Sequence, residues 1–303
     1  MAQKEKYPLQ GVVVSLNTPF AADGRIDFDS VARTVEQHLK EGAVGFLTPA
    51  QAGEVYELDL QEKIELVRCV KTATQDRAMV IAGATAAQQD ESRTTAEAAV
   101  ALGCEGVLAE VPQELKHQPK KILAFFEELA KLGMPMLMIQ DLEWGGAGME
   151  VPLIAALSER IDAFRCLKVE VAPAGPKYSA VLAATAGRLH VSGGWASDQM
   201  IEALDRGVSV FMNTAMTGIF YRIFDAYRKG EREKARQHFH SMLPVLAFTR
   251  QHLDISIQFY KRLFVRRRLF STCKVRKQCL PYDAWHQRYG EELMDYLDQV
   301  EGV

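Results

Sequence analysis

Short apolar runs alternate with helical patterns eight times along the first 230 residues, and this alternation constrains the fold more than any other feature. The apolar runs predict strands near 11–15, 45–48, 78–82, 106–111, 135–139, 164–171, 189–192 and 208–212. Between them, apolar residues recur with helical spacing, as at Ile122, Phe125, Phe126 and Leu129. Eight strand-then-helix units in about 220 residues predict an α/β fold, a closed (β/α)8 TIM barrel.

The pattern changes after residue 230. Three helical stretches remain, near 231–250, 254–270 and 282–299, with no strand between them. We therefore expect a barrel over 1–230 and a C-terminal helical region over 231–303, packed on the barrel as an extension. An open doubly wound sheet is the alternative architecture, but no GxGxxG motif follows the first strand.

Composition and charge exclude several classes of protein. The chain is 48% hydrophobic and 25% charged with a net charge of −3, so no overall field favours nucleic acid or an anionic membrane. Residues 1–6 lack the apolar run of a signal peptide, and no apolar run reaches membrane-spanning length. The five cysteines form no CxxC pair, which favours reduced thiols in the cytoplasm.

One lysine lies inside an apolar strand. Period-2 alternation puts Lys168 on the same face as Cys166 and Glu170, so it is expected to point into the barrel near the rim where active sites form. Burial would favour the neutral amine, which can attack a carbonyl carbon. The alternative is an ion pair with Glu170 or Glu110, and both interpretations stay open. The rival Lys177 falls on a predicted helix and is expected to be a solvated surface charge.

Other motifs carry less chemistry. His238 and His240 are two residues apart on a predicted helix and face different directions, and the remaining histidines are scattered, so no metal site is expected. Gly193 and Gly194 precede a helix, where they could cradle a phosphate, form a tight turn, or lie close to a substrate. The basic run from 261 to 277 is interleaved with aromatic residues and is expected as a helix with solvated charges rather than a nucleic-acid site.

Several of these segments resemble the dihydrodipicolinate synthase / N-acetylneuraminate lyase family. They are Leu167-Lys168-Val169-Glu170, the turn at 173–177, Thr18-Pro19-Phe20, Gly53-Glu54, Gly193-Gly194 and the segment 261–270. The resemblance covers nearly the whole chain and agrees with the barrel. It implies class I aldolase or lyase chemistry without a cofactor: Lys168 would form an imine with the ketone of pyruvate or another 2-oxo acid. It also implies a homo-oligomer, a dimer or tetramer.

The chain departs from the family in the loop that binds the 2-oxo carboxylate. That loop usually reads Gly-Thr-Thr-Gly-Glu, and here it reads Ala50-Gln51-Ala52-Gly53-Glu54. Both hydroxyl groups are missing. The backbone N–H groups of Gln51 and Ala52 can still hold a carboxylate, so both residues are expected to bind substrate.

Other family positions are also replaced. Ungapped alignment from Pro135 puts Ile139 where the family has a tyrosine that relays protons, and the tyrosine pair after strand four falls on Gln113 and Glu114. The arginine that binds the second substrate in synthase members falls on Trp144. Lysine biosynthesis, which condenses pyruvate with aspartate semialdehyde, is therefore not the expected reaction.

Three carboxylates near strand ends are candidates to replace the missing relay: Glu110, Asp141 and Glu170. Asp141 is the first choice, because it lies two residues after Ile139 and shares its side of the strand. The alternative for Asp141 is a cap for a loop or helix. Gln140 is expected to donate a hydrogen bond to substrate, with a loop tether as its alternative.

Two functional classes follow from these patterns, and a third has less support. The first is a Schiff-base lyase or aldolase acting on pyruvate or another 2-oxo acid, sugar-acid derivatives included, with the imine on Lys168. The second is a catalytically altered or inactive family member that binds a 2-oxo acid as a binding or regulatory protein. The third is a phosphate-binding barrel enzyme unrelated to imine chemistry.

Overall fold

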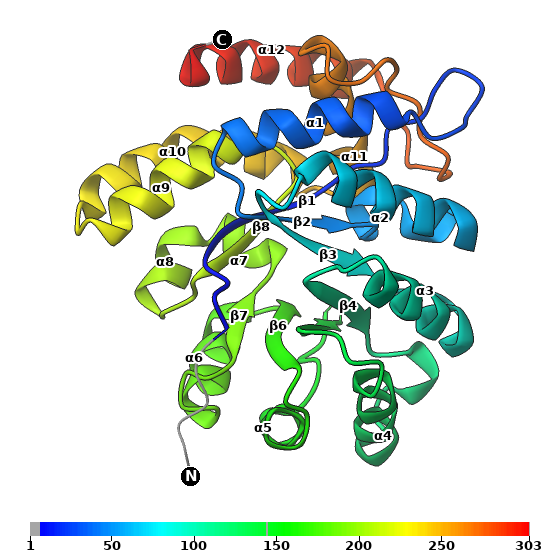
Figure 1. Ribbon diagram of the computed structural model, residues 1–303. Coiled ribbons are helices and arrows are strands. Elements are labelled where there is room, and N and C mark those ends of the chain that lie inside the picture. The colour runs from blue at the N-terminus through cyan, green and yellow to red at the C-terminus, as the bar shows by residue number, and fades with distance from the viewer. Residues whose placement is uncertain (1–6, 144, 303) are drawn as a thin grey trace.

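A ring of parallel strands surrounded by helices forms the body of the protein, seen here in a computed structural model that describes residues 7–143 and 145–302 (Figure 1). The strands are β1 (Gly11–Ser15), β2 (Gly45–Thr48), β3 (Met79–Gly83), β4 (Gly106–Glu110), β5 (Leu137–Leu142), β6 (Phe164–Glu170), β7 (His190–Ser192) and β8 (Val210–Asn213). They pair in the order β7-β6-β5-β4-β3-β2-β1-β8, every pair parallel. Since β7 and β8 also contact each other, the sheet is a nearly closed barrel, and the predicted fold class is confirmed.

The helices follow the strands in the predicted alternation. The α-helices are α1 (Phe28–Lys40), α2 (Leu60–Thr74), α3 (Gln89–Ala101), α4 (Pro119–Ala130), α5 (Val151–Arg160), α6 (Ala174–Ala184), α7 (Gly194–Asp198), α8 (Met200–Asp205) and α9 (Thr217–Arg228). Three short 3-10 turns, η1 (Gln51–Gly53), η2 (Val55–Glu57) and η3 (Gln113–Leu115), lie in loops after strands. The segment between β7 and β8 forms two short helices, α7 and α8, because the backbone leaves helical geometry at Gln199.

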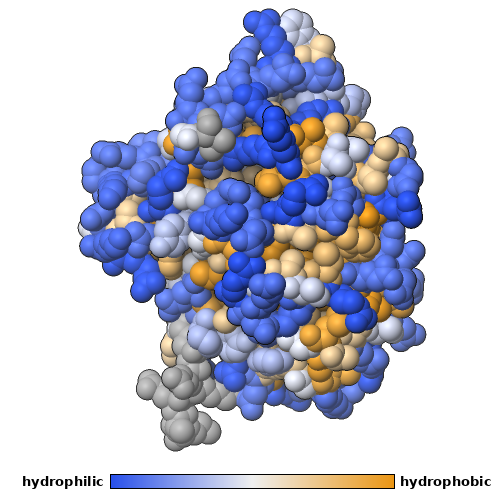
Figure 2. Space-filling view, turned by 45° about the horizontal axis from the view of Figure 1, so that its top comes forward, coloured by the Kyte–Doolittle hydropathy of each residue, from blue (hydrophilic) through white to orange (hydrophobic). Residues whose placement is uncertain are grey.

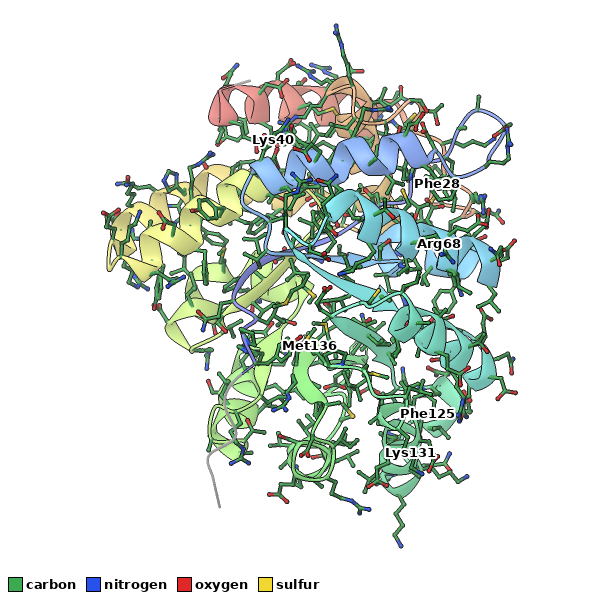
Figure 3. The ribbon with its side chains drawn as sticks, viewed as in Figure 1. Phe28, Lys40, Arg68, Phe125, Lys131 and Met136 are labelled. Atoms are coloured by element: carbon green, nitrogen blue, oxygen red, sulfur yellow. The ribbon has the colours of Figure 1, made fainter. Side chains whose placement is uncertain are left out.

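Two apolar layers account for the period-2 pattern of the strands. The inner layer fills the barrel with side chains such as Val13, Leu47, Met138 and Cys166. Figure 3 shows Met136 of this inner layer toward the barrel axis, whereas the exposed side chains of Lys40 and Lys131 lie at the outside. The outer layer packs the opposite face of each strand against the helices. Each strand is therefore buried on both faces, as parallel strands usually are.

The fifth strand begins two residues later than predicted and continues three residues further. Pro135 has no N–H to give to the ladder, so regular pairing starts at Leu137, where the register with β6 also shifts. Gln140 and Asp141 consequently lie within the strand rather than after it. Because successive side chains of a strand point to opposite faces, only one of these two residues faces the barrel interior.

Three helices follow the barrel: α10 (Arg232–Thr249), α11 (Leu253–Arg266) and α12 (Ala284–Glu301). They gather with α1 and α9 on one side of the barrel, and α11 also contacts η1 at the rim (Figure 1). On the face drawn in Figure 2, mostly hydrophilic side chains surround smaller hydrophobic patches. Within the described residues, no helix is long and apolar enough to cross a membrane.

Candidate active site

Four inward-facing side chains form a row across neighbouring strands at the carboxyl end of the barrel. The strand register pairs Glu110 with Gln140, Gln140 with Lys168, and Lys168 with Ser192. Their neighbours along each strand, such as Ala109, Ile139 and Leu167, belong to the outer apolar layer. Adjacent strands are about 4.8 Å apart, so the amide of Gln140 lies directly beside the amine of Lys168.

Lys168 is buried in this row, with 5% of its surface exposed. Below it lie the inner-layer side chains Met138 and Cys166, which offer the amine no charge. The Lys168 Nζ lies 3.5 Å from Oε1 of Glu170, which is also buried. This ion pair matches one of the two interpretations of Lys168, and it also gives the amine an acceptor for its proton. Glu110 is hydrogen-bonded elsewhere, to Gln51 and Tyr56.

A cavity of about 100 Å³ opens beside Lys168. The barrel supplies one wall, which includes Gln51, Ala52, Gln140 and Glu170. The opposite wall comes from the C-terminal helices and contains Leu246, Arg250, Leu253, Ser256 and Tyr260. The cavity is small, so it suits a compact group such as the keto-acid end of a substrate. The described C-terminal helices therefore belong to the site as well as to the scaffold.

The turn η1 forms part of the cavity wall and carries backbone N–H groups without a protein acceptor in the described part of the chain. Gln51 and Ala52 both line it, and among the described residues neither backbone N–H donates to another protein atom. The turn is held from the first strand's loop: the Asn17 side chain donates to the carbonyl of Ala52, and Thr18 Oγ1 donates to the carbonyl of Gly53 at 2.7 Å. Unused N–H groups at the start of a 3-10 turn are suitable donors to a carboxylate.

Gln140 occupies the interior position that the ungapped alignment gave to Ile139. The Ile139 side chain faces the outer layer, so that placement is wrong by one residue. Gln140 is 2% exposed, and its Oε1 has no hydrogen-bond partner within the described part of the chain. A buried polar atom without a partner is rare in proteins and suggests that a ligand completes it. The predicted location of Gln140 at the site agrees with this geometry.

The structure does not bring Asp141 to Lys168. Asp141 pairs with Val169 in the register and points to the outer face of β5. Its carboxylate lies 2.5 Å from Lys177 Nζ and accepts the N–H of Met149 at 2.8 Å. Burial raises the pKa of Asp141, although the neighbouring Lys177 opposes this effect. The geometry thus favours the loop-tethering alternative for Asp141 over the relay.

Lys177 differs from its predicted setting in one respect. It lies on α6 as expected, but its side chain is only 9% exposed and pairs with Asp141 instead of lying in solvent. Its carbonyl partner, Ala147, fixes the loop between β5 and α5. Lys177 is therefore held in the outer layer, away from the cavity beside Lys168.

The two glycines after β7 have different tasks. Gly193 has φ +154°, and a Cβ there would lie 2.2 Å from the carbonyl oxygen of Val169, so close backbone approach requires glycine. Gly194 lines the cavity, but its N–H donates to Glu170 Oε1 at 2.8 Å and its carbonyl accepts from Arg250 at 2.9 Å. Because that N–H is already used, these glycines offer little to a phosphate.

A second cavity of about 400 Å³ adjoins the first and shares Gln51, Gln140 and Leu142 with it. Its lining is mainly neutral and polar, with Glu110 and Lys116 as its charged groups. Glu110 accepts hydrogen bonds from Gln51 at 2.8 Å and from Tyr56 at 3.2 Å. Burial, together with Glu110, raises the pKa of Tyr56 to about 12, so this phenol stays a donor at neutral pH.

Three residues that the sequence did not single out also line the first cavity: Asp198, Arg250 and Tyr260. Arg250 follows α10 and pairs with Asp198 on α7, which links the C-terminal helices to the loop after β7. Asp198 follows the two glycines by only four residues, and that proximity was the available signal. Nothing in the local pattern of Arg250 or Tyr260 indicated their position, since both arrive through tertiary packing.

The described residues contain no group of three histidine, cysteine or acidic side chains placed to hold a metal ion. The five cysteines are free thiols. Trp144, expected at the position of the synthase arginine, lies outside the described residues. Gln113 lines the second cavity, and Glu114 beside it is exposed and bound to Gln89.

Comparison with known proteins agrees with this geometry. The model of the dihydrodipicolinate synthetase family matches residues 8–281. The chain belongs to this family. A family member named 4-hydroxy-tetrahydrodipicolinate synthase, from Xanthomonas campestris pv. campestris, is 28% identical over 231 residues, covering 75% of this chain and 76% of that protein. Another from Pseudomonas aeruginosa is 33% identical over 131 residues, which span 43% of this chain and only 45% of that relative.

Solved structures of the family share the fold. Dihydrodipicolinate synthase from Rhodopseudomonas palustris superposes with a TM-score of 0.86 at 19% identity, covering 97% of this chain and 100% of that one. YagE, a prophage protein of the dihydrodipicolinic acid synthase family from E. coli K12 solved in complex with pyruvate, gives a TM-score of 0.84 at 17% identity, covering 97% and 99%. At these identities the likeness establishes architecture alone.

The buried carboxyl of Asp198 predicts a pH dependence of stability. Burial raises its pKa to about 6 against the opposing effect of Arg250, so the folded protein takes up a proton on Asp198 at a pH where the unfolded chain does not. This contribution to stability should therefore increase as pH falls from about 6 toward 4, by roughly 2 kcal/mol. Urea unfolding at several pH values should show the free-energy difference between wild type and Asp198→Asn growing in wild type's favour over that window. A difference that stays constant with pH contradicts the assignment.

Proposed function

We propose that this protein is a Schiff-base lyase or aldolase that forms an imine between Lys168 and the ketone of pyruvate or another 2-oxo acid. The observation that carries the proposal is the buried Lys168 amine, which lies 3.5 Å from a carboxylate and lines a small cavity together with Gln51 and Ala52 of η1. Membership of the dihydrodipicolinate synthetase family supports it, as does the relative YagE, whose structure contains pyruvate. The lyase assignment extends to this chain from its family.

In the proposed complex the substrate carboxylate accepts hydrogen bonds from the N–H groups of Gln51 and Ala52. That places the ketone carbon toward Lys168 Nζ and the keto oxygen toward the N–H group of the Gln140 amide, while the Oε1 of Gln140, unpartnered within the described residues, can accept from a substrate hydroxyl. Hydrogen bonds to a charged group contribute about 1.5–3 kcal/mol each, so two backbone donors can replace the missing hydroxyl groups of the family loop. The expected binding role of Gln51, Ala52 and Gln140 is kept in this proposal.

Glu170 is our candidate for the acid–base role first given to Asp141. Imine formation begins when the lysine ammonium gives up a proton and the neutral nitrogen attacks the ketone carbon. A proton then passes from nitrogen to the alkoxide, and the resulting hydroxyl leaves as water after a second protonation. A carboxylate 3.5 Å from Nζ can take the first proton and return it to the leaving hydroxyl. The protonated imine draws the electrons of a bond to carbon 3: either C3–H breaks and its proton passes to Glu170, or C3–C4 of an aldol breaks as the aldol hydroxyl gives its proton to Glu170. The enamine formed then takes a proton at carbon 3.

The second cavity bears on the rest of the substrate. Its glutamines, the Tyr56 phenol and one charge of each sign suit an uncharged chain of hydroxyl groups, such as that of a sugar-acid derivative. Glu110 pairs with Gln140 in the strand register and would repel a distal carboxylate at that place, so we do not expect aspartate semialdehyde to be the second substrate. A homo-oligomer, either a dimer or a tetramer, and a cytoplasmic location complete the proposal by analogy with the family.

The alternative is a family member that binds a 2-oxo acid without turning it over. The observation that favours it is the side chain that β5 places next to Lys168 in the register: Gln140 is an amide and cannot carry a proton. Both functions predict binding at Lys168, and only the first predicts proton exchange at carbon 3 of the bound acid.

Borohydride reduction in the presence of pyruvate tests the imine directly. One equivalent should become covalently attached, because reduction converts the imine into a stable secondary amine, and intact mass should report a single increment. The Lys168→Ala variant should show none. Peptide mapping that places the increment on Lys177, or an increment that persists in Lys168→Ala, would remove the proposal.

Exchange of the pyruvate methyl protons for deuterium tests the role of Glu170 without knowledge of the second product. Glu170→Gln should slow exchange by about 10²–10⁴-fold, the usual contribution of a general acid–base group, while borohydride still traps pyruvate. Asp141→Asn is the matched control: it should lower the melting temperature and leave exchange per folded molecule nearly unchanged.

Two other results would contradict parts of the proposal. An exchange rate in Glu170→Gln equal to that of wild type would rule out Glu170 as the proton relay. Trapping by the wild-type protein with no exchange at all favours the binding protein over the enzyme.

A further inference from the structure

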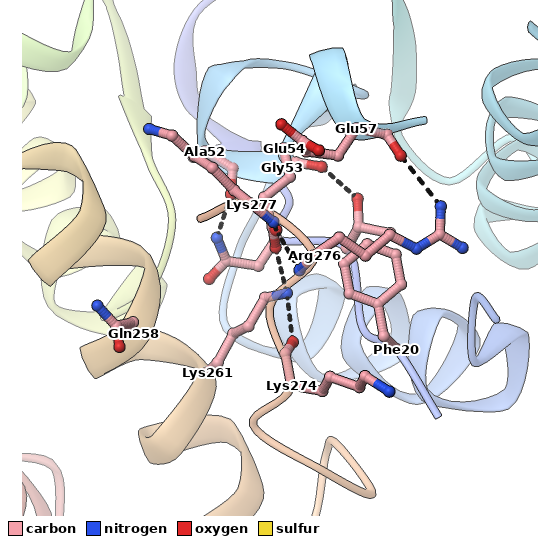
Figure 4. Close-up of polar contacts among 12 residues, drawn as sticks. Phe20, Ala52, Gly53, Glu54, Glu57, Gln258, Lys261, Lys274, Arg276 and Lys277 are labelled. Carbon is pink, nitrogen blue, oxygen red and sulfur yellow. Dashed lines mark hydrogen bonds and ion pairs between the residues drawn. The ribbon is translucent and has the colours of Figure 1, made fainter. Parts of the chain in front are cut away.

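A fully buried ion pair joins the C-terminal helices to the turn that lines the candidate site. The ammonium of Lys261 on α11 contacts the carboxylate of Glu54, the residue directly after η1, and both side chains are 0% exposed (Figure 4). The two residues are 207 positions apart in the chain. A buried pair of this kind need not add stability over an apolar pair, because both charges must be removed from water. Each charge must nevertheless stay close to its partner, because a displaced partner would leave the other charge buried and unpaired.

One short C-terminal segment makes the other hydrogen bonds to this ion pair. Glu54 Oε2 accepts the backbone N–H groups of Arg276 at 2.8 Å and Lys277 at 2.9 Å. Lys261 Nζ also donates to the carbonyl of Lys274 at 2.8 Å and lies 4.4 Å from the centre of the Phe20 ring. The segment 274–277 is thus fixed to Glu54 by two hydrogen bonds and to Lys261 by a third.

Glu54 is positioned to control the conformation of η1. Its backbone lies in the left-handed region at φ 58°, which is unfavourable for glutamate and must be stabilised by its surroundings. Its N–H donates to the carbonyl of Gln51 at 3.2 Å, which closes the turn. The side-chain anchor therefore acts on the same short turn that carries Gln51 and Ala52, whose backbone N–H groups have no partner among the described residues.

We propose that Lys261 and the segment 274–277 are positioning elements for the substrate carboxylate, acting through Glu54. This inference rests on the proposed function, because it assigns a purpose to the N–H groups that would bind the 2-oxo acid. Neither Lys261 nor Glu54 lines the cavity. Their effect should appear in how tightly the acid binds, and the chemistry at Lys168 should be preserved once the acid is bound.

The experiment measures the pyruvate concentration that gives half-maximal borohydride trapping. Lys261→Met leaves Glu54 without its partner, and we expect the half-saturating concentration to rise about tenfold or more, since a 1.4 kcal/mol loss corresponds to tenfold. The final extent of trapping at saturating pyruvate should match wild type. The double variant Glu54→Gln, Lys261→Met removes both charges and should recover part of the lost affinity.

A matched control separates positioning from general loss of stability. Lys63 on α2 is also buried and pairs with Glu91 on α3 at 2.7 Å, and neither residue lines the lysine cavity. Lys63→Met should lower the melting temperature in the same way and leave the half-saturating pyruvate concentration unchanged. An increase in that concentration in Lys63→Met as large as in Lys261→Met would overturn the inference.

A folded Lys261→Met with wild-type half-saturation would overturn it as well. If Lys261→Met fails to fold, Glu54→Asp decides the question, because it keeps the charge and shortens the anchor by one methylene. The same increase is then expected, and wild-type half-saturation in Glu54→Asp rejects the inference. Absence of trapping in the wild-type protein is a separate result that rejects the proposed function itself.

Discussion

A lysine amine enclosed in the interior of a parallel barrel is the constraint on which the rest of this site depends. Burying an isolated ammonium costs free energy, because it loses its hydration. Here Glu170 lies 3.5 Å from the amine, and a small cavity lies above the apolar layer. In the proposed reaction, the carboxylate that stabilises the ammonium also receives its proton. Stability of the buried ion pair and the proposed chemistry therefore both require Lys168 and Glu170 on the same face of β6.

The C-terminal helices complete the site in two separate places. Arg250 and Tyr260 form part of the cavity wall opposite the strands, and Arg250 pairs with Asp198 at the loop after β7. On the other side, Lys261 is buried against Glu54 next to the turn that lines the cavity. A barrel without these helices would keep Lys168 but would lose one cavity wall and the anchor of the turn.

The alternation of strands and helices could be predicted from the sequence because hydrophobic periodicity reports burial directly. The inward direction of Lys168 followed from the same alternation, and so did the strand that holds it. The facing of β5 could not be derived in this way, because a shift of one residue exchanges the two faces of a strand. Counting from Pro135 without a gap put Ile139 and Asp141 inside, whereas the observed register puts Gln140 there.

Contacts between residues from distant parts of the chain could not be predicted from local sequence patterns either. The basic run after 261 suggested solvated charges, but Lys261 is fully buried and Arg276 contacts Glu62 and the Phe20 ring. Lys177 was expected in solvent, and its pairing with Asp141 depends on how α6 packs over β5. Charge patterns along a helix indicate a polar face, but they do not reveal which charge meets a partner from another element.

The most direct test of the proposed site is a crystal structure of the protein after borohydride reduction with pyruvate. We expect continuous density from Lys168 Nζ to the substrate carbon, with the carboxylate about 3 Å from the N–H groups of Gln51 and Ala52. Glu170 should lie beside the new amine, and Gln140 should contact the substrate. An adduct on another lysine, or an adduct on Lys168 whose carboxylate lies on Arg250 instead of η1, would contradict it.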